Sequence, residues 1–169
     1  LSLHDALPIW KGKYLIFVFD NEKVLISHLR MEGKYMYFNE DDSITKHARV
    51  VFHLENDEKV VYDDSRCFGT MELHSFNDLD NIPSISKLGK EPMDMTKDEL
   101  YLKLKNKTSY IKTALLDQTI MAGLGNIYVD ETLFESKINP YKTAKDKTIT
   151  STIHNIAIFF IISSSLLFI

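Results

Sequence analysis

The feature that most constrains the fold is a change of hydrophobic period near the middle of the chain. Before this change, short apolar runs follow one another, and each is bounded by polar turn residues. There are six such runs, at residues 13–19, 24–29, 33–38, 48–54, 59–63 and 71–74. Runs of this length with short polar connections are typical of antiparallel sheets. The first half of the chain therefore predicts an antiparallel β-sandwich.

The second half of the chain has the period of an α-helix. Apolar residues recur at helical spacing at Leu100 and Leu104, and again at Ile111, Leu115 and Leu116. Thr96 precedes Lys97-Asp98-Glu99 and predicts an N-cap with acidic residues in the first turn. A later helical pattern ends at Asn139-Pro140, where proline cannot continue it. The two halves together predict an α+β fold.

The segment between the two patterns is polar and contains Pro83, Gly89 and Pro92. It predicts a linker with short helical pieces at most. We therefore divide the chain into a leader at 1–10, a truncated β module at 11–76, a linker at 77–96 and a truncated helical module at 97–169. Because the chain begins with Leu1 and ends in an apolar run, we expect a fragment of a longer protein.

Cysteine content and charge limit the classes of function. The chain has 169 residues and one cysteine, Cys67, which excludes an internal disulfide framework and predicts a reducing compartment, the cytoplasm. No Cys/His cluster has zinc spacing, so we expect no metal site. The apolar run Ile156–Ile162 is shorter than the ~18–20 residues of a membrane span, and we expect no membrane partner. A membrane-tethered or structural protein using this tail stays an alternative.

A glycine-rich turn at Ala122-Gly123-Leu124-Gly125-Asn126 precedes a predicted helix. Free N–H groups at a helix start bind anions, and the Asn126 side chain can cap the helix or donate to an anion. Four lysines precede this turn within ten residues that contain no acid: Lys103, Lys105, Lys107 and Lys112. The net charge of −4 argues against general polyanion binding, but this cluster favours a phosphate-backbone site. The alternative is a plain turn between two helices.

Three places beside the predicted strands carry candidate functional residues. Lys13 follows Gly12 at the mouth of a strand, where a lysine is more often a solvated edge charge. Met31 lies at a loop tip, where an apolar side chain can act as a wedge between bases. Arg66 and Phe68 share another loop and suit stacking and phosphate contact, or an Arg packed over Phe at a sheet edge. No Ser/His/Asp motif supports nucleophilic catalysis.

Six segments, in order, resemble the formamidopyrimidine-DNA glycosylase family. They are KGKYLIF, LISHLRMEGKY, KHARVVFHL, YDDSRCFGTMEL, LGKEP and IKTALLDQTIMAGLGNIYVDETLFESKINP. The resemblance covers residues 11–147, and the GLGNIYVDE motif is highly specific. Endonuclease VIII is a sister family, but the Met of HLRMEG with the Arg and Phe of RCFG favours the formamidopyrimidine branch.

The resemblance implies a base-excision repair enzyme, a glycosylase and AP lyase. Such an enzyme removes oxidised purines, 8-oxoguanine and formamidopyrimidines, from double-stranded DNA and nicks the strand by β/δ-elimination. The implied fold is a β-sandwich followed by a helical domain with a helix–two-turns–helix DNA-binding motif. The implied partner is damaged duplex DNA, bound by a monomer.

The resemblance also assigns roles to residues of this sequence. Lys13 matches the proton donor for β-elimination. Met31, Arg66 and Phe68 match the side chains that enter the duplex and fill the gap left by the flipped base. The remaining matched positions contact DNA: His47, Arg66 and Lys107, with Lys112 and Asn126 on phosphates.

Two parts of the family pattern are missing from this sequence. The family's nucleophile is an N-terminal proline followed by a glutamate, and LSLHDALPIW does not match that start. The family's zinc finger needs four cysteines, so Zn²⁺ is expected only in the intact parent. We therefore expect this fragment to lack glycosylase activity and to give no borohydride-trapped complex with DNA. The alternative is a catalytically dead module that binds damaged DNA.

Overall fold

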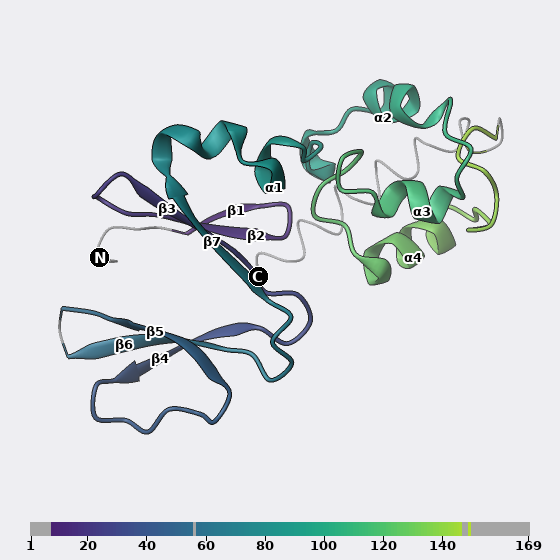
Figure 1. Ribbon diagram of the computed structural model, residues 1–169. Helices are drawn as coiled ribbons and strands as arrows, with labels where there is room; N and C mark the ends of the chain where they lie inside the picture. The colour runs from purple at the N-terminus through teal and green to yellow at the C-terminus, as the bar shows by residue number, and fades with distance from the viewer. Residues whose placement is uncertain (1–7, 56, 147–148, 150–169) are drawn as a thin grey trace. The chain divides into compact units, whose positions relative to one another are not determined.

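The computed structural model describes residues 8–55, 57–146 and 149 (Figure 1). The chain divides after Ile85 into two compact units. This division falls inside the segment that the sequence predicts as a linker. In the structure that segment contains three short helical pieces, η1 (Phe76–Asn81), α1 (Pro83–Ser86) and η2 (Pro92–Asp94).

The first unit consists of two antiparallel sheets that face each other (Figure 1). One sheet has the order β1-β2-β3-β7 and the other the order β4-β6-β5. The strands are β1 (Ile9–Lys11), β2 (Tyr14–Val18), β3 (Lys23–His28), β4 (Lys34–Asn39), β5 (Ala48–His53), β6 (Glu58–Asp63) and β7 (Thr70–Ser75). The predicted sandwich is confirmed, and all six predicted runs form strands. The structure adds β1, which includes the last two residues of the predicted leader and pairs with β2.

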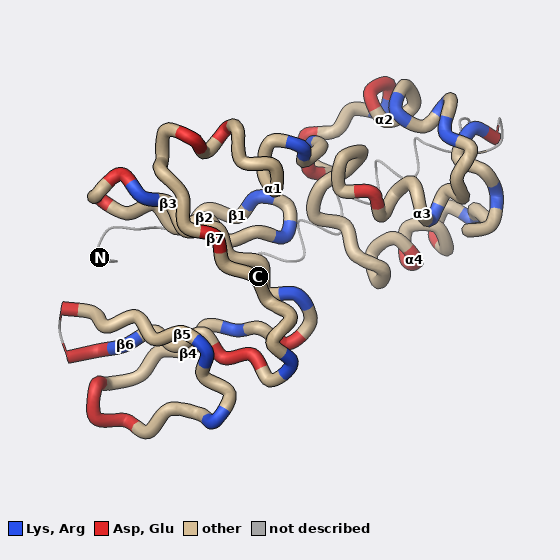
Figure 2. The backbone as a smooth tube through the Cα atoms, in the orientation of Figure 1, with Lys and Arg blue, Asp and Glu red and all other residues tan. Residues whose placement is uncertain are grey.

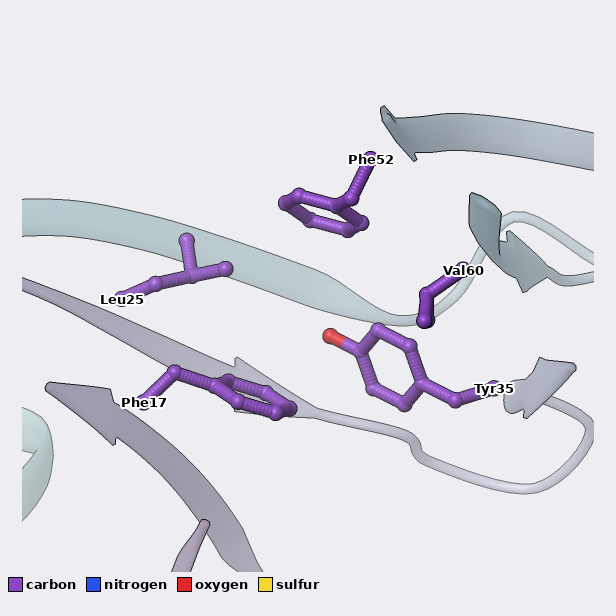
Figure 3. Close-up of a pocket in the computed structure, with 5 residues that line it drawn as sticks. All are labelled: Phe17, Leu25, Tyr35, Phe52 and Val60. Atoms are coloured by element: carbon purple, nitrogen blue, oxygen red, sulfur yellow. The ribbon is translucent and has the colours of Figure 1, made fainter. Parts of the chain in front are cut away.

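The core of the sandwich is formed by side chains that alternate along the strands toward the facing sheet. Figure 3 shows Phe17 and Leu25 from one sheet opposite Tyr35, Phe52 and Val60 from the other, around a small apolar gap. The Phe17 and Tyr35 rings meet edge to face at 5.3 Å. A hydrogen bond of 2.9 Å from the Tyr35 hydroxyl to Ser27 Oγ satisfies both polar groups between the sheets.

The second unit contains α2 (Lys97–Leu104), α3 (Ile111–Leu116) and α4 (Asn126–Glu135). The predicted start of α2 is confirmed: Thr96 and Glu99 form a capping box, in which each side chain accepts from the other's backbone N–H. The five apolar residues that predicted the helices pack in or against one core. Truncating such a core side chain costs about 2–5 kcal/mol, so this core holds the three helices together.

The end of α4 differs from the prediction that Asn139-Pro140 stops it. The helix ends at Glu135, and Lys137 takes a left-handed φ of 55°. The N–H groups of Lys137 and Ile138 donate to the carbonyls of Phe134 and Leu133, both at 2.9 Å. This is a Schellman motif, which ends a helix by satisfying its last carbonyls before any proline is reached.

The part of the chain that the structure describes contains no helix long and apolar enough to cross a membrane. The apolar run on which the membrane-tether alternative rests, Ile156–Ile162, lies outside the described residues.

Candidate nucleic-acid interface

Lys13 lies in the two-residue turn between β1 and β2. Its partner in the turn, Gly12, has a φ of 61°, the arrangement of a hairpin turn that places glycine at the first central position. Partial burial and then the nearby Arg30 guanidinium lower the pKa of Lys13. A larger fraction of the Lys13 amine is therefore neutral, and a neutral amine can accept a proton and return it.

His28 lies beside Lys13 and was not among the predicted site residues. It is paired in register with Tyr14, and the two rings meet edge to face at 4.8 Å. Its Nδ1 accepts the Arg30 backbone N–H at 3.0 Å. Partial burial, followed by the charges of Arg30 and Lys13, lowers the pKa of His28. A neutral His28 with its proton on Nε2 follows, and only the pairing of β2 with β3 could have revealed this neighbourhood.

Met31 lies at the tip of the loop from Leu29 to Gly33, with 74% of its surface exposed. The Gly33 N–H donates to the Leu29 carbonyl at 3.1 Å and closes the loop. Arg30 takes a left-handed φ of 57°, which is uncommon for a residue with a side chain. The loop thus presents an apolar side chain to solvent on a backbone that is held in place.

Arg66 and Phe68 lie in the loop from Asp64 to Gly69, and the structure brings both together with Met31. The Arg66 guanidinium carbon lies 4.6 Å from the centre of the Phe68 ring, a cation–π contact. The same guanidinium donates to the Met31 sulfur, with an N–S distance of 3.6 Å. The predicted trio therefore forms one exposed cluster from two loops that are distant in sequence.

His47 precedes β5 and lies beside the same loop. Its carbonyl accepts the Asp64 N–H at 3.1 Å, and its own N–H donates to Thr45 Oγ1 at 3.2 Å. The half-buried imidazole is thus held through its backbone rather than through its ring. Four of the predicted side chains, Met31, His47, Arg66 and Phe68, come from three loops joined by direct contacts.

In the helical unit, three of the four clustered lysines already have partners. Lys103 donates to the Thr119 carbonyl at 3.0 Å. Lys107 pairs with Asp117 at 3.6 Å, and Lys112 pairs with Asp130 at 2.7 Å. Figure 2 shows acidic as well as basic positions on α2, basic positions toward α3, and acidic positions on α4. The cluster contains no acid in sequence, but folding supplies acids from residues further along the chain.

The glycine-rich turn is held from inside by Gln118, a residue that sequence reasoning missed. Its Nε2 donates to the carbonyls of Leu116 and Leu124, and its Oε1 accepts the Gly123 N–H at 2.9 Å. Gly123 has a φ of 89°, a left-handed conformation that glycine adopts without strain, and this accounts for glycine at this position. Gly125 is the N-cap residue of α4 with a φ of −116°, an extended conformation that does not require glycine.

Asn126 is the first residue of α4 and is exposed. No side chain caps this helix, so the predicted capping role of Asn126 is not observed. The first N–H groups of a helix have no partner within it, and they attract anions. The start of α4 therefore combines uncapped N–H groups with an exposed amide, and Lys112 of α3 pairs with Asp130 one turn further along α4.

The described residues offer no set of donors for the zinc ion that is expected in a longer parent protein. Zinc fingers of the family type use four cysteine thiolates, and Cys67 is the one cysteine of the chain. Within residues 8–55, 57–146 and 149, no three His, Cys, Asp or Glu side chains gather where they could hold a metal ion. The residues present do not fit this ion, and nothing below depends on it.

Two family models match this chain in separate regions. The formamidopyrimidine-DNA glycosylase N-terminal domain matches residues 10–71, which include the three loops. The formamidopyrimidine-DNA glycosylase H2TH domain matches residues 88–159, which include the glycine-rich turn and α4. The match agrees with the helix–two-turns–helix expectation for the helical unit.

Known proteins of the same kind are similar over most of this chain. The formamidopyrimidine-DNA glycosylase of Oceanobacillus iheyensis is 48% identical over 134 residues, which are 78% of this chain and 48% of that protein. That of Streptococcus pneumoniae is 46% identical over 140 residues, 82% of this chain and 51% of that protein. The Lactococcus lactis glycosylase bound to DNA containing an AP site has a TM-score of 0.84 and 41% identity, over 91% of this chain and 59% of that one.

These similarities define the two-part fold of a DNA glycosylase family, a β-sandwich followed by a helical H2TH domain. The chain belongs to the formamidopyrimidine-DNA glycosylase family. It spans about half the length of the curated relatives that it matches.

Proposed function

We propose that this chain is the lesion-binding part of a base-excision repair enzyme, a DNA glycosylase and AP lyase for oxidised purines in duplex DNA. The observation that carries the proposal is the exposed cluster of Met31, Arg66 and Phe68. An exposed apolar side chain and a cation stacked on an aromatic ring can fill the gap that a flipped base leaves in a base stack, where they are shielded from water. Solved relatives at 41% identity are bound to DNA containing an AP site and to DNA containing FAPY-dG.

The proposed substrates are 8-oxoguanine and formamidopyrimidines, and the proposed chemistry of the longer protein ends in β/δ-elimination. Lys13 is the proposed proton donor of the elimination step. Partial burial and the nearby Arg30 lower the pKa of Lys13, and this supports the role because the neutral form of the amine can take up a proton and release it again. Lys107, Lys112, Asn126 and His47 are the proposed contacts to the DNA backbone. A cytoplasmic monomer stays a prediction.

The proposal is tested by the binding of the 169-residue chain to duplex DNA, measured by fluorescence anisotropy. One duplex contains a tetrahydrofuran abasic analogue, and a second has the same sequence without the lesion. We expect tighter binding to the first duplex and a linear fall of log affinity with log salt for both. Equal affinity for the two duplexes, or binding that ignores salt, would contradict the proposal.

Two substitutions test whether the proposed residues contribute to this binding. Lys107→Ala and Asn126→Ala should weaken binding to both duplexes, since phosphate contacts carry no lesion information. Lys107→Ala should also reduce the salt slope by about one phosphate contact. Lys87→Ala, an exposed lysine outside the proposed contacts, is the matched control. Excision of 8-oxoguanine by the chain itself would overturn the expectation that this chain binds without cleaving.

A further inference from the structure

Asp64 is a buried carboxylate at the end of β6, with 1% of its surface exposed. Its Oδ1 accepts the Arg66 N–H at 3.0 Å, and its Oδ2 accepts the Gly69 N–H at 2.8 Å and the Tyr62 hydroxyl at 3.3 Å. A buried charge is tolerated only when it is hydrogen-bonded in this way. The Gly69 N–H is the main reason that the pKa of Asp64 lies below its ordinary value. The carboxylate thus fastens both ends of the loop that carries Arg66 and Phe68.

The backbone of Asp64 fastens a second segment. Its N–H donates to the His47 carbonyl at 3.1 Å, and its carbonyl accepts Arg49 Nε at 2.8 Å. His47 and Arg49 flank the start of β5. One residue therefore ties the loop that carries Arg66 to the segment that carries His47.

Tyr62 joins a third loop to the same centre. A Cβ placed on Gly33 or on Gly69 would overlap the Tyr62 hydroxyl, so both loops approach this side chain as closely as glycine allows. Burial, with the nearby Asp64 carboxylate, raises the pKa of Tyr62 to about 12. The hydroxyl therefore stays a donor to Asp64 at any working pH. Gly33 ends the loop that carries Met31.

Resting on the proposed function, we propose that Asp64 and Tyr62 are positioning residues for lesion recognition. They hold the three DNA-facing loops in one arrangement and do not touch DNA themselves. Loops ordered before binding lose less conformational freedom when they insert, so the pair increases the affinity for a lesion. The residues that it positions are Met31, His47, Arg66 and Phe68.

The test uses the full 169-residue chain with Tyr62→Phe, Asp64→Asn and a matched control, Tyr37→Phe. Tyr62→Phe removes only the hydroxyl that donates to Asp64. Asp64→Asn presents an amide NH₂ where a backbone N–H needs an acceptor. Tyr37 is 59% exposed in β4, so its variant makes the same chemical change away from the three loops.

Cys67 supplies a readout that needs no DNA. It is the chain's one cysteine, is exposed, and lies in the loop that Asp64 fastens. We expect its thiol to react faster with Ellman's reagent in Tyr62→Phe and in Asp64→Asn than in the wild type or in Tyr37→Phe. A rate that is unchanged in both variants would overturn the inference.

Lesion preference supplies the second readout, as the ratio of affinities for tetrahydrofuran and undamaged duplexes. We expect Asp64→Asn to lower this ratio about tenfold, the effect of leaving a buried donor unpaired, with an unchanged salt slope. Tyr62→Phe should lower the ratio less, and this variant alone tests the inference if Asp64→Asn does not fold. A ratio that both variants retain, or an equal loss for both duplexes, overturns this inference alone. A wild-type chain without preference overturns the proposed function, and this role with it.

Discussion

The two units carry their proposed DNA contacts in different ways. In the β unit, the side chains proposed to enter DNA touch one another and are exposed, while a buried polar pair holds their loops. In the helical unit, an apolar core holds the turn before α4, and the proposed cations are already paired with carboxylates. The first arrangement is prepared for insertion, whereas the second must exchange its partners when a phosphate arrives.

This exchange costs little. Ion pairs at exposed positions contribute about 0–1 kcal/mol, because water screens them. Lys107, Lys112 and their acids are all at least one-third exposed. A phosphate can therefore replace Asp117 or Asp130 with a small loss, and the paired acids keep the lysines ordered until then. The comparison predicts that the β unit sets lesion preference and that the helical unit sets general affinity.

The largest expected effect is on the core that supports the helical contacts. Leu115 in α3 is fully buried, and Leu115→Ala should lower the free energy of unfolding by about 2–5 kcal/mol. Leu102→Ala, at a position that is 57% exposed, is the matched control and should cost far less. Urea denaturation measures both. Equal losses for the two variants would show that the buried core does not hold this unit.

The next effect is on the buried polar centre of the β unit. Gly69→Ala places a Cβ against the Tyr62 hydroxyl and should cost about 1–3 kcal/mol of stability, because the site is overpacked. Gly125→Ala is the comparison in the other unit, where a φ of −116° suits alanine. Chemical denaturation should show the larger loss for Gly69→Ala. The reverse order would mean that the loops are not packed against Tyr62 as described.

A smaller effect, of opposite sign, tests the paired lysines. Asp130→Asn releases Lys112 and should tighten binding to undamaged duplex about two- to fivefold, consistent with a weak exposed pair. Glu131→Gln makes the same change of charge one residue further along α4 and separates release of the lysine from simple loss of negative charge. Anisotropy titrations at one salt concentration measure both. Equal tightening in the two variants would show that the loss of negative charge, and not the release of Lys112 from its ion pair, causes the effect.

The smallest effect concerns pH and the start of α2. A hydrogen bond from Lys90, and then the Thr96 N–H, lower the pKa of Glu99 from 4.5 to about 2. A lowered carboxyl pKa adds stability above pH 4.5, and this contribution is lost as the pH falls toward 2. The stability difference between the wild type and Glu99→Gln should therefore shrink over this range. A difference that stays constant between these pH values would contradict the assignment.

The sequence predicted the parts of the fold that depend on local pattern. Alternation and turn residues located all six runs, and Thr96 with Glu99 identified the start of α2, because both signals lie within a few residues. Strand β1 was missed because Ile9-Trp10-Lys11 is too short to show a period. The left-handed Lys137 that ends α4 was missed because lysine carries no signal for that conformation.

The sequence predicted the exposed residues of the candidate site, but it did not predict the residues that hold their loops in place. Met31, Arg66 and Phe68 stand at loop tips, where their chemistry is visible in sequence. The roles of Asp64, Tyr62 and Gln118 depend on hydrogen bonds that exist only after distant segments meet. The acids that pair with Lys107 and Lys112 lie ten and 18 residues further along, outside any local pattern.

The most direct test of the central claim uses 2-aminopurine placed opposite a tetrahydrofuran residue in duplex DNA. If Met31, Arg66 and Phe68 enter the stack at the lesion, the wild-type chain should unstack the opposite base and raise its fluorescence. Phe68→Ala should lose most of this rise, and Phe134→Ala, at a phenylalanine 78% exposed on α4, should keep it. A wild-type chain that binds this duplex without any rise, or a Phe68→Ala variant with the full rise, would contradict the account.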